Sequence, residues 1–269
     1  PLPLPLLTIP CVAAALSVHR YQSAVRSGLA RVTAGDAFSA DAGSGYLAVA
    51  QAMQAATPCL ALALLWFSSQ SIAADVSGDT LRNTLVRSLR RQDVLLGKVT
   101  VLLSTCLLGW AASLATAVGF SWLKVGFGDL EEVFEAGDRE VLAEAADVAP
   151  AMLVAATQML LPLCAVVLIS TAASALVRRP AMALALAAAF LLGPDMVRLW
   201  APEQSGWLLT SHLPSAWRDD SVLNYLAATA RGAADALWLY ADLAVWAPLA
   251  WAAAAIVALT ITFQRMRIS

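Results

Sequence analysis

The sequence predicts an all-α, polytopic membrane protein made of one transmembrane domain over residues 1–269. Composition is the first indication: 60% of the residues are hydrophobic and 13% are charged. Soluble domains are roughly half apolar and about a quarter charged. The second indication is that the apolar residues gather in long segments, and the third is that the charged residues divide unevenly between the loops.

Six segments are long and apolar enough to be membrane spans, each of which needs about 20 mostly apolar residues. The first segment contains Pro3, Pro5 and Pro10, so only its second half is free of helix breakers. We therefore expect the first helix to be truncated, or distorted where it begins. The predicted spans cover residues 2–18, 47–74, 94–120, 149–177, 181–200 and 236–263.

The charges of the loops predict the orientation of the chain. Six spans place both termini on one side, together with the loops that follow the second and fourth spans. That side carries nine cations and three acids, whereas the other side carries eight cations and sixteen acids. Because Lys and Arg concentrate on the cytoplasmic side of membrane proteins, we expect a cytoplasmic C-terminus and an acidic outer side.

Two outer segments are more than short turns. In residues 126–150, Asp129 and Glu132 have the spacing of a capping box, and apolar residues recur at helical intervals. This pattern predicts an amphipathic helix, which would lie solvated on the membrane or bind a partner. Residues 202–235 predict one or two interfacial or re-entrant helices beside a belt of aromatic residues: Trp200, Trp207, Trp217, Trp238 and Tyr240.

Several classes of function are disfavoured by what the sequence contains. A net charge of −2 without a basic stripe argues against nucleic-acid binding. Two histidines, and cysteines that are far apart in the sequence, give no metal-ligand or catalytic pattern, so no metal site and no catalytic residue are predicted and an intramembrane enzyme is improbable. Each cysteine is interpreted as a small apolar residue.

The polar residues inside the predicted spans are uncharged. Without ionisable groups deep in the spans, proton-coupled transport has no support. The polar residues are interpreted as interhelical hydrogen-bonding groups: Gln51, Gln54, Gln158, Ser170, Thr171 and Ser174. For the three glutamines the alternative is that they line a conduit.

The loop between the second and third spans, residues 75–98, is the most informative segment. Asp79 or Thr80 can cap a short helix, on which Leu81, Leu85, Val86 and Leu89 form an apolar stripe among arginines. A short cationic amphipathic helix can lie on lipid headgroups or dock in a groove of a soluble partner. Physical reasoning alone leaves both possibilities open.

This loop resembles the signature of ABC-2-type transporter permeases. In that family an acidic residue follows span two, then come Gly-Thr-Leu, an apolar run, Pro-x-Ser-Arg, and an apolar pair with Gly-Lys at the start of span three. Asp75 takes the acidic position, Thr80 and Leu81 match Thr-Leu, Arg90 or Arg91 matches the arginine, and 94–98 matches the end. Asp79 replaces the glycine, and no proline precedes the arginines.

The resemblance implies a permease subunit in a bacterial-type inner membrane. It would pair with a second copy or a paralogue and with two separate ATPase subunits that hold ATP and Mg²⁺, and it would perform export or extracytoplasmic work. The loop would be the coupling helix, and the residues implied to transmit force are Asp75, Asp79, Thr80, Leu81, Arg82, Leu85, Arg87, Arg90, Arg91, Gly97 and Lys98. The alternative is a membrane scaffold without a conduit that recruits an extracytoplasmic protein through its acidic segments.

Overall fold

The computed structural model describes a mostly helical chain. The described residues are 4–33, 39–41, 43–78, 91–134, 139–177, 179–193, 200, 206–213, 230–231 and 243–265. The helices are α1 (Leu4–Thr33), α2 (Gly45–Gln70), α3 (Ala73–Ser77), α5 (Arg91–Lys124), α6 (Ala145–Gln158), α7 (Leu160–Leu176), α8 (Pro180–Leu192), the 3₁₀ turn η3 (Leu209–His212) and α10 (Leu243–Arg265). The strands are β1 (Ser39–Asp41), β2 (Leu130–Phe134) and β3 (Arg139–Ala143).

Four helical stretches within the described residues are long and apolar enough to cross a membrane: Gly45–Ser77, Gln92–Lys124, Ala145–Leu176 and Leu243–Arg265. They coincide with the second, third, fourth and sixth predicted spans. The fifth, α8, is apolar but shorter. The first, α1, is much longer than predicted, and its second half carries arginines. The prediction of six spans is therefore supported at four places.

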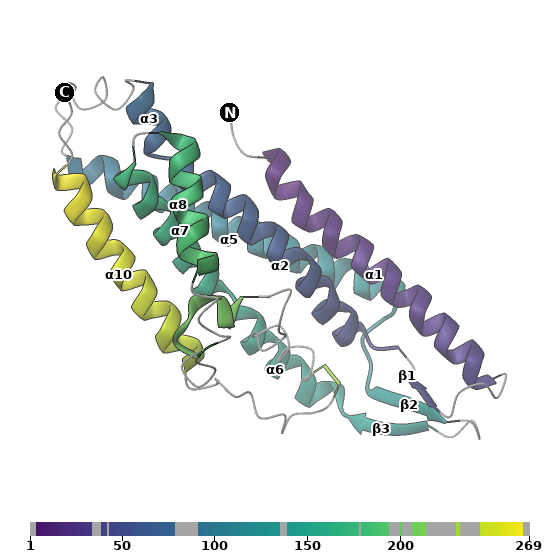
Figure 1. Ribbon diagram of the computed structural model, residues 1–269. Helices are drawn as coiled ribbons and strands as arrows, with labels where there is room; N and C mark the ends of the chain where they lie inside the picture. The colour runs from purple at the N-terminus through teal and green to yellow at the C-terminus, as the bar shows by residue number, and fades with distance from the viewer. Residues whose placement is uncertain are drawn as a thin grey trace.

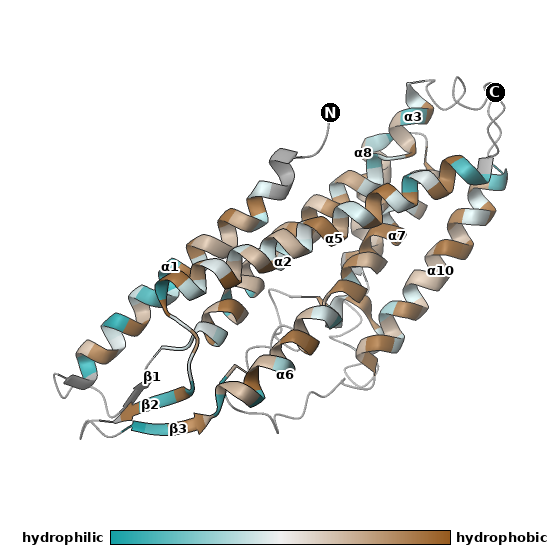
Figure 2. Ribbon diagram, turned by 180° about the vertical axis from the view of Figure 1, so that it is seen from behind, coloured by the Kyte–Doolittle hydropathy of each residue, from teal (hydrophilic) through white to brown (hydrophobic). Residues whose placement is uncertain are grey.

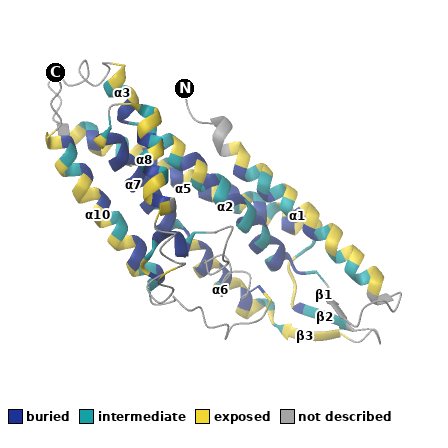
Figure 3. Cartoon of the chain, viewed as in Figure 1, coloured by how far each residue is buried: buried dark blue, intermediate teal, exposed yellow. Residues whose placement is uncertain are grey.

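The helices form an elongated bundle in which α2 and α7 are central (Figure 1). Figure 3 shows these two helices largely buried, whereas α10 keeps one exposed face. The start of α1, the short helix α3 and the end of α10 lie at one end of the bundle, and the sheet lies at the opposite end. Figure 2 shows that hydrophobic residues predominate along the ribbons of α5, α7 and α10.

Two helices depart from the predicted boundaries at prolines. The predicted span 149–177 is two helices, α6 and α7, that meet at Met159. Pro162 has no N–H to bond to the carbonyl of residue 158, so it weakens the continuous hydrogen-bond ladder there. At the start of the chain, α1 begins at Leu4 and continues through Pro10, so that proline does not end the helix.

The predicted outer helix over 126–150 is wrong. The segment forms β2 and β3, which pair antiparallel with Glu131 opposite Val141, and β2 also pairs with β1. Arg139 makes an ion pair with Glu131 of the neighbouring strand at 3.1 Å. Asp129 has a different role from the predicted one, because its carboxylate accepts the N–H of Ala145, the first residue of α6, at 2.8 Å. A small sheet therefore stands at this end of an otherwise helical chain.

The other predicted outer elements lie largely outside the described residues. Of the aromatic belt, Trp200 and Trp207 are described, and both are exposed. The indole N–H of Trp251 on α10 donates to the carbonyl of Trp207 at 2.9 Å. Trp217, Trp238, Tyr240 and most of residues 202–235 are not among the described residues.

The packing of α5 on α7 brings two free cysteines together. The free thiols of Cys106 on α5 and Cys164 on α7 lie near enough to interact with each other. We expect the oxidant diamide to convert the two thiols into a disulfide, with diamide reduced to its hydrazine. Tryptic cleavage at exposed Arg139 would then leave the α5 and α7 fragments joined on a non-reducing gel. The C164S variant should release them, and release in the oxidised parent chain would contradict this packing.

Candidate functional site

The candidate site is the junction at which α2 turns into α3. The chain leaves α2 at Gln70, turns through Ser71 and Ile72, and continues as α3. The hydroxyl of Ser174 on α7, which is fully buried, accepts the N–H groups of Ile72 and Ala73 at 3.0 and 2.9 Å. These two amides belong to the start of α3, where backbone donors have no partner in the helix. One buried hydroxyl therefore fastens the junction to α7.

Lys98 fastens the same junction to α5. Its ammonium donates to a carboxylate oxygen of Asp75 on α3 and to the backbone carbonyl of Ser71. The side chains of Lys98 and Asp75 are 22% and 37% exposed, so the ion pair is only partly solvated. Asp75 precedes residues 79–90 and Lys98 follows them, so the ion pair connects the helices on either side of this segment. The segment holds most of the predicted coupling helix.

A small apolar cluster lies beneath the ion pair and draws on four helical stretches. Ile72 comes from the α2–α3 turn and Leu95 from α5, both buried. Ala172 and Ala175 come from α7, and α10 contributes Leu259 and Phe263. All four stretches that are long enough to cross a membrane therefore meet at this end, so a displacement of the junction would be transmitted to each of them through close-packed side chains.

An open groove of about 710 Å³ lies beside the ion pair. It is lined by α2, α3 and α5, and carries the carboxylates of Asp75 and Asp93 and the ammonium of Lys98. Gly97 lies in the same groove and is exposed, and a Cβ added there would meet nothing within 4 Å. The junction therefore presents a mixed polar and apolar surface that can accept a docked segment.

The structure brings three of the predicted coupling residues together: Asp75, Gly97 and Lys98. Arg91 is the first residue of α5, and its side chain is not described. The other predicted residues lie outside the described part of the chain: Asp79, Thr80, Leu81, Arg82, Leu85, Arg87 and Arg90.

The predicted conduit residues divide between two elements. Gln51 and Gln54 lie half-buried on α2, and Gln158 is the last residue of α6. The amide oxygen of Gln158 is buried and has no hydrogen-bond partner among the described residues. The groove beside the Asp75–Lys98 ion pair is lined by other residues. Whether the three glutamines line a conduit stays a prediction.

Two residues of the junction were not predicted as site residues. Ser71 contributes only its backbone carbonyl, which no side-chain pattern can reveal. Ser174 is a polar side chain in an apolar helix, and such a residue is a signal for an interhelical hydrogen bond. Its neighbour Thr171 instead bonds within α7, to the carbonyl of Val167 at 2.7 Å. Local sequence therefore cannot distinguish the bridging hydroxyl from the intrahelical one.

Replacing Ser174 by Ala is expected to destabilise the fold, because two buried backbone N–H groups lose their acceptor. Each buried unsatisfied group costs about 1–3 kcal/mol. Ser170 offers a matched control one turn away on α7, since it is equally buried and its hydroxyl has no partner among the described residues. Thermal unfolding in detergent should show a clear fall in Tm for Ser174→Ala and little change for Ser170→Ala. Equal shifts would contradict the bridging role of Ser174.

The described residues contain no group of three His, Cys, Asp or Glu side chains that could hold a metal ion. Comparison with known proteins adds no relative, because no family model and no curated protein matches the sequence.

Proposed function

We propose that this chain is the membrane-spanning permease subunit of an ABC transporter of the ABC-2 type. In this proposal two separate ATPase subunits hydrolyse ATP, and the permease, paired with a second copy or a paralogue, converts that work into export or extracytoplasmic action. The observation that supports it best is the ion pair between Asp75 and Lys98. These residues occupy the acidic and lysine positions of the resemblance, and they lie together although they are 23 positions apart in the sequence.

The proposed mechanism is mechanical. The ATPase would contact the arginine-rich segment 79–90, which joins α3 to α5. Lys98 binds both Asp75 and the Ser71 carbonyl, so a force on this segment would move the end of α2 and the start of α5 as one unit. Ser174 and the apolar cluster would pass the motion to α7 and α10. The cargo is not specified by these contacts.

The proposal places the chain in a bacterial-type inner membrane with its C-terminus in the cytoplasm. It is supported by the asymmetry of charge between loops and by the common end of α3 and α10 (Figure 1). At that end the described cations include Lys98, Arg179 and Arg265. Lys and Arg on one side of a membrane protein favour the cytoplasmic face.

The direct experiment is co-purification. The permease, tagged and extracted in mild detergent, should bring down an ATPase with Walker motifs, and its addition should stimulate ATP hydrolysis by that ATPase. Mutation of the lysine in the partner's phosphate-binding loop should abolish hydrolysis and leave the complex intact. A permease that is inserted and monodisperse, yet neither binds the ATPase encoded beside it nor changes its turnover, would refute the proposal.

The exposed surface of Gly97 gives a second test. Glycine inside a helix costs about 1 kcal/mol relative to Ala, and no atom of the described residues lies within 4 Å of a Cβ added at this position. We expect Gly97→Leu to insert normally and to reduce ATPase stimulation about tenfold, equivalent to about 1.4 kcal/mol, because the partner would approach closely there. Thr100→Leu, also exposed on α5 but outside the groove, is the control. Equal activity of both variants would exclude close docking at Gly97.

A second candidate function is a membrane scaffold for an extracytoplasmic protein. The observation in its favour is β3, an edge strand whose residues Arg139, Glu140, Val141 and Leu142 are all exposed. Exposed edge strands can pair with a strand from another chain. A scaffold predicts that changes in β3 abolish partner recruitment and that changes at Lys98 have no effect.

A further inference from the structure

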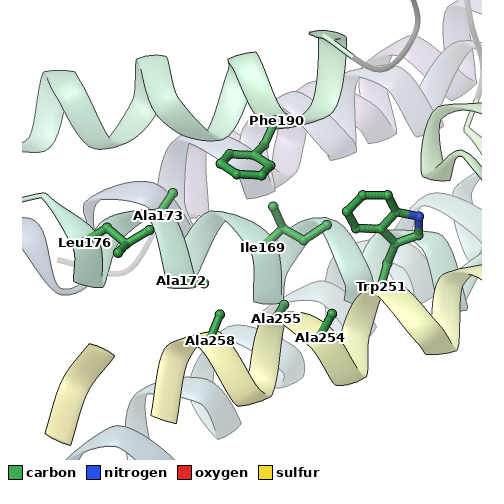
Figure 4. A pocket seen from close by; sticks show the side chains of 9 residues that line it. All are labelled: Ile169, Ala172, Ala173, Leu176, Phe190, Trp251, Ala254, Ala255 and Ala258. Atoms are coloured by element: carbon green, nitrogen blue, oxygen red, sulfur yellow. The ribbon is translucent and has the colours of Figure 1, made fainter. Parts of the chain in front are cut away.

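An apolar groove runs along the second half of α7, and one of its residues, Ala172, also belongs to the apolar cluster of the junction. Its floor is formed by α7, at Ile169, Ala172 and Ala173, and its walls are Phe190 of α8 and the alanine face of α10 (Figure 4). Helices α8 and α10 each pack closely on α7 but barely touch each other. The groove is the space left between them.

The chemistry of the groove excludes a polar ligand. Every residue that lines it is apolar: Ile169, Ala172, Ala173, Leu176, Phe190, Trp251, Ala254, Ala255 and Ala258. The indole nitrogen of Trp251 is already used, since it donates to the carbonyl of Trp207. The volume is about 170 Å³, similar to apolar cavities of about 150 Å³ that stay dry and accept hydrocarbon. Phe190 and Leu176 are 51% and 56% exposed, so the groove is open to its surroundings.

The position of the groove fits one lipid tail. From Arg265, at the end of α10, a rise of about 1.5 Å per residue gives about 10 Å to Ala258 and about 20 Å to Trp251. Half of a bilayer's hydrocarbon core is about 15 Å thick. A phospholipid with its phosphate level with Arg265 would therefore place the far part of an acyl chain between α8 and α10.

The charges at the end of the groove favour an anionic headgroup. Arg179 precedes α8 directly and Arg265 ends α10, and both are exposed. Helices α7, α8 and α10 contain no Asp or Glu. Asp75 of α3, which packs against α8, is paired with Lys98. Guanidinium groups bind phosphate through charge-assisted hydrogen bonds.

We propose that the groove between α8 and α10 is a binding site for one acyl chain of an anionic phospholipid, whose headgroup lies beside Arg179 and Arg265. The bound chain fills space that the protein leaves open and supplies the missing contact between α8 and α10, because unfilled apolar surface forfeits dispersion contacts. This inference requires a membrane but no ATPase, and so it holds independently of the proposed transporter function.

Native mass spectrometry of the purified full chain tests the site with dioleoyl phosphatidylglycerol and dioleoyl phosphatidylcholine as probes. Ala254→Phe fills the groove, whereas Ala253→Phe places the same ring at the next exposed position of α10, outside the groove. We expect the parent chain and Ala253→Phe to retain one phosphatidylglycerol, and Ala254→Phe to retain at least about fivefold less, equivalent to about 1 kcal/mol. Replacement of both Arg179 and Arg265 by Gln should remove the preference over phosphatidylcholine.

Equal retention of phosphatidylglycerol by Ala254→Phe and Ala253→Phe would overturn the site, and so would equal retention of the two lipids by the parent chain. If Ala254→Phe does not fold, Ala258→Phe replaces it. Phosphatidylglycerol with brominated chains provides a test in the parent chain, because bromine quenches nearby indoles. Its quenching should fall in Trp251→Phe, and unchanged quenching would place the lipid elsewhere.

Discussion

Replacing Lys98 by Met is expected to reduce stimulation of the partner ATPase at least tenfold, while the chain still inserts. The ammonium of Lys98 holds both the Asp75 carboxylate and the Ser71 carbonyl, so its loss separates α3 from α5 at the point of proposed force transfer. Ion pairs of this exposure stabilise by only about 1 kcal/mol. The large effect is therefore expected in coupling and not in folding, and ATPase assays in proteoliposomes measure it.

The ion pair between Arg139 and Glu131 at the other end of the bundle supplies the control. Arg139→Met also breaks a salt bridge but should leave ATPase stimulation unchanged. The exchanged pair, Asp75→Lys with Lys98→Asp, should recover part of the activity, since the ion pair is restored and the bond to Ser71 is not. Full ATPase stimulation by the Lys98→Met variant would mean that the junction does not couple the permease to the ATPase.

Reversing the charges of Arg90 and Arg91 to Glu is expected to prevent assembly with the ATPase. The change moves the local charge by four units, and truncation or reversal of interface charges typically costs several kcal/mol. A loss of about 2.7 kcal/mol corresponds to a hundredfold weaker Kd. Co-purification at increasing salt measures the effect, and the parent complex should itself weaken as salt screens the arginines.

Charge reversal of Lys124 and Arg139, which lie away from the junction, is the matched control for this variant. It alters the net charge equally and should leave the complex intact. If Arg90→Glu with Arg91→Glu assembles with unchanged affinity, the arginine-rich segment is not the docking element.

The long apolar helices could be predicted from the sequence because the bilayer sets their length. Four of the predicted spans coincide with stretches that meet this criterion. Their ends were less accurate. Residues 149–177 form one apolar run in the sequence, yet they make two helices because Pro162 weakens the backbone hydrogen bonding between them. The first helix begins at Leu4 and continues to Thr33, through a polar, arginine-bearing stretch that hydropathy excludes from a membrane span.

The sheet could not be predicted, because β2 pairs with a strand far away in the sequence. The apolar residues of 130–145 fit helical spacing as well as strand spacing. The residues around β1 give no sequence pattern that predicts a strand there, although Ala40 of β1 pairs with Val133. Pairing with β1, which is distant in the sequence, therefore determined that the segment forms a strand and not a helix.

The candidate site was predicted in part. Asp75, Gly97 and Lys98 were identified from a motif, and the structure adds a direct contact between the two charged groups. Ser174 was expected to form a hydrogen bond between helices, but its partners, the N–H groups of Ile72 and Ala73, could not be predicted because they depend on where α7 lies relative to the α2–α3 turn. Interhelical bonds of this kind follow from tertiary packing, whereas the motif follows from the order of residues.

The most direct measurement places a photo-cross-linking amino acid at position 85 in intact membranes. The account predicts an adduct with an ATPase that carries Walker motifs, formed on the side of the membrane that holds the C-terminus, with a yield that changes when ATP is added. The same probe at Val141 on β3 should give no such adduct. An adduct at position 85 that forms only with lipid, or only from the opposite side of the membrane, would contradict the account.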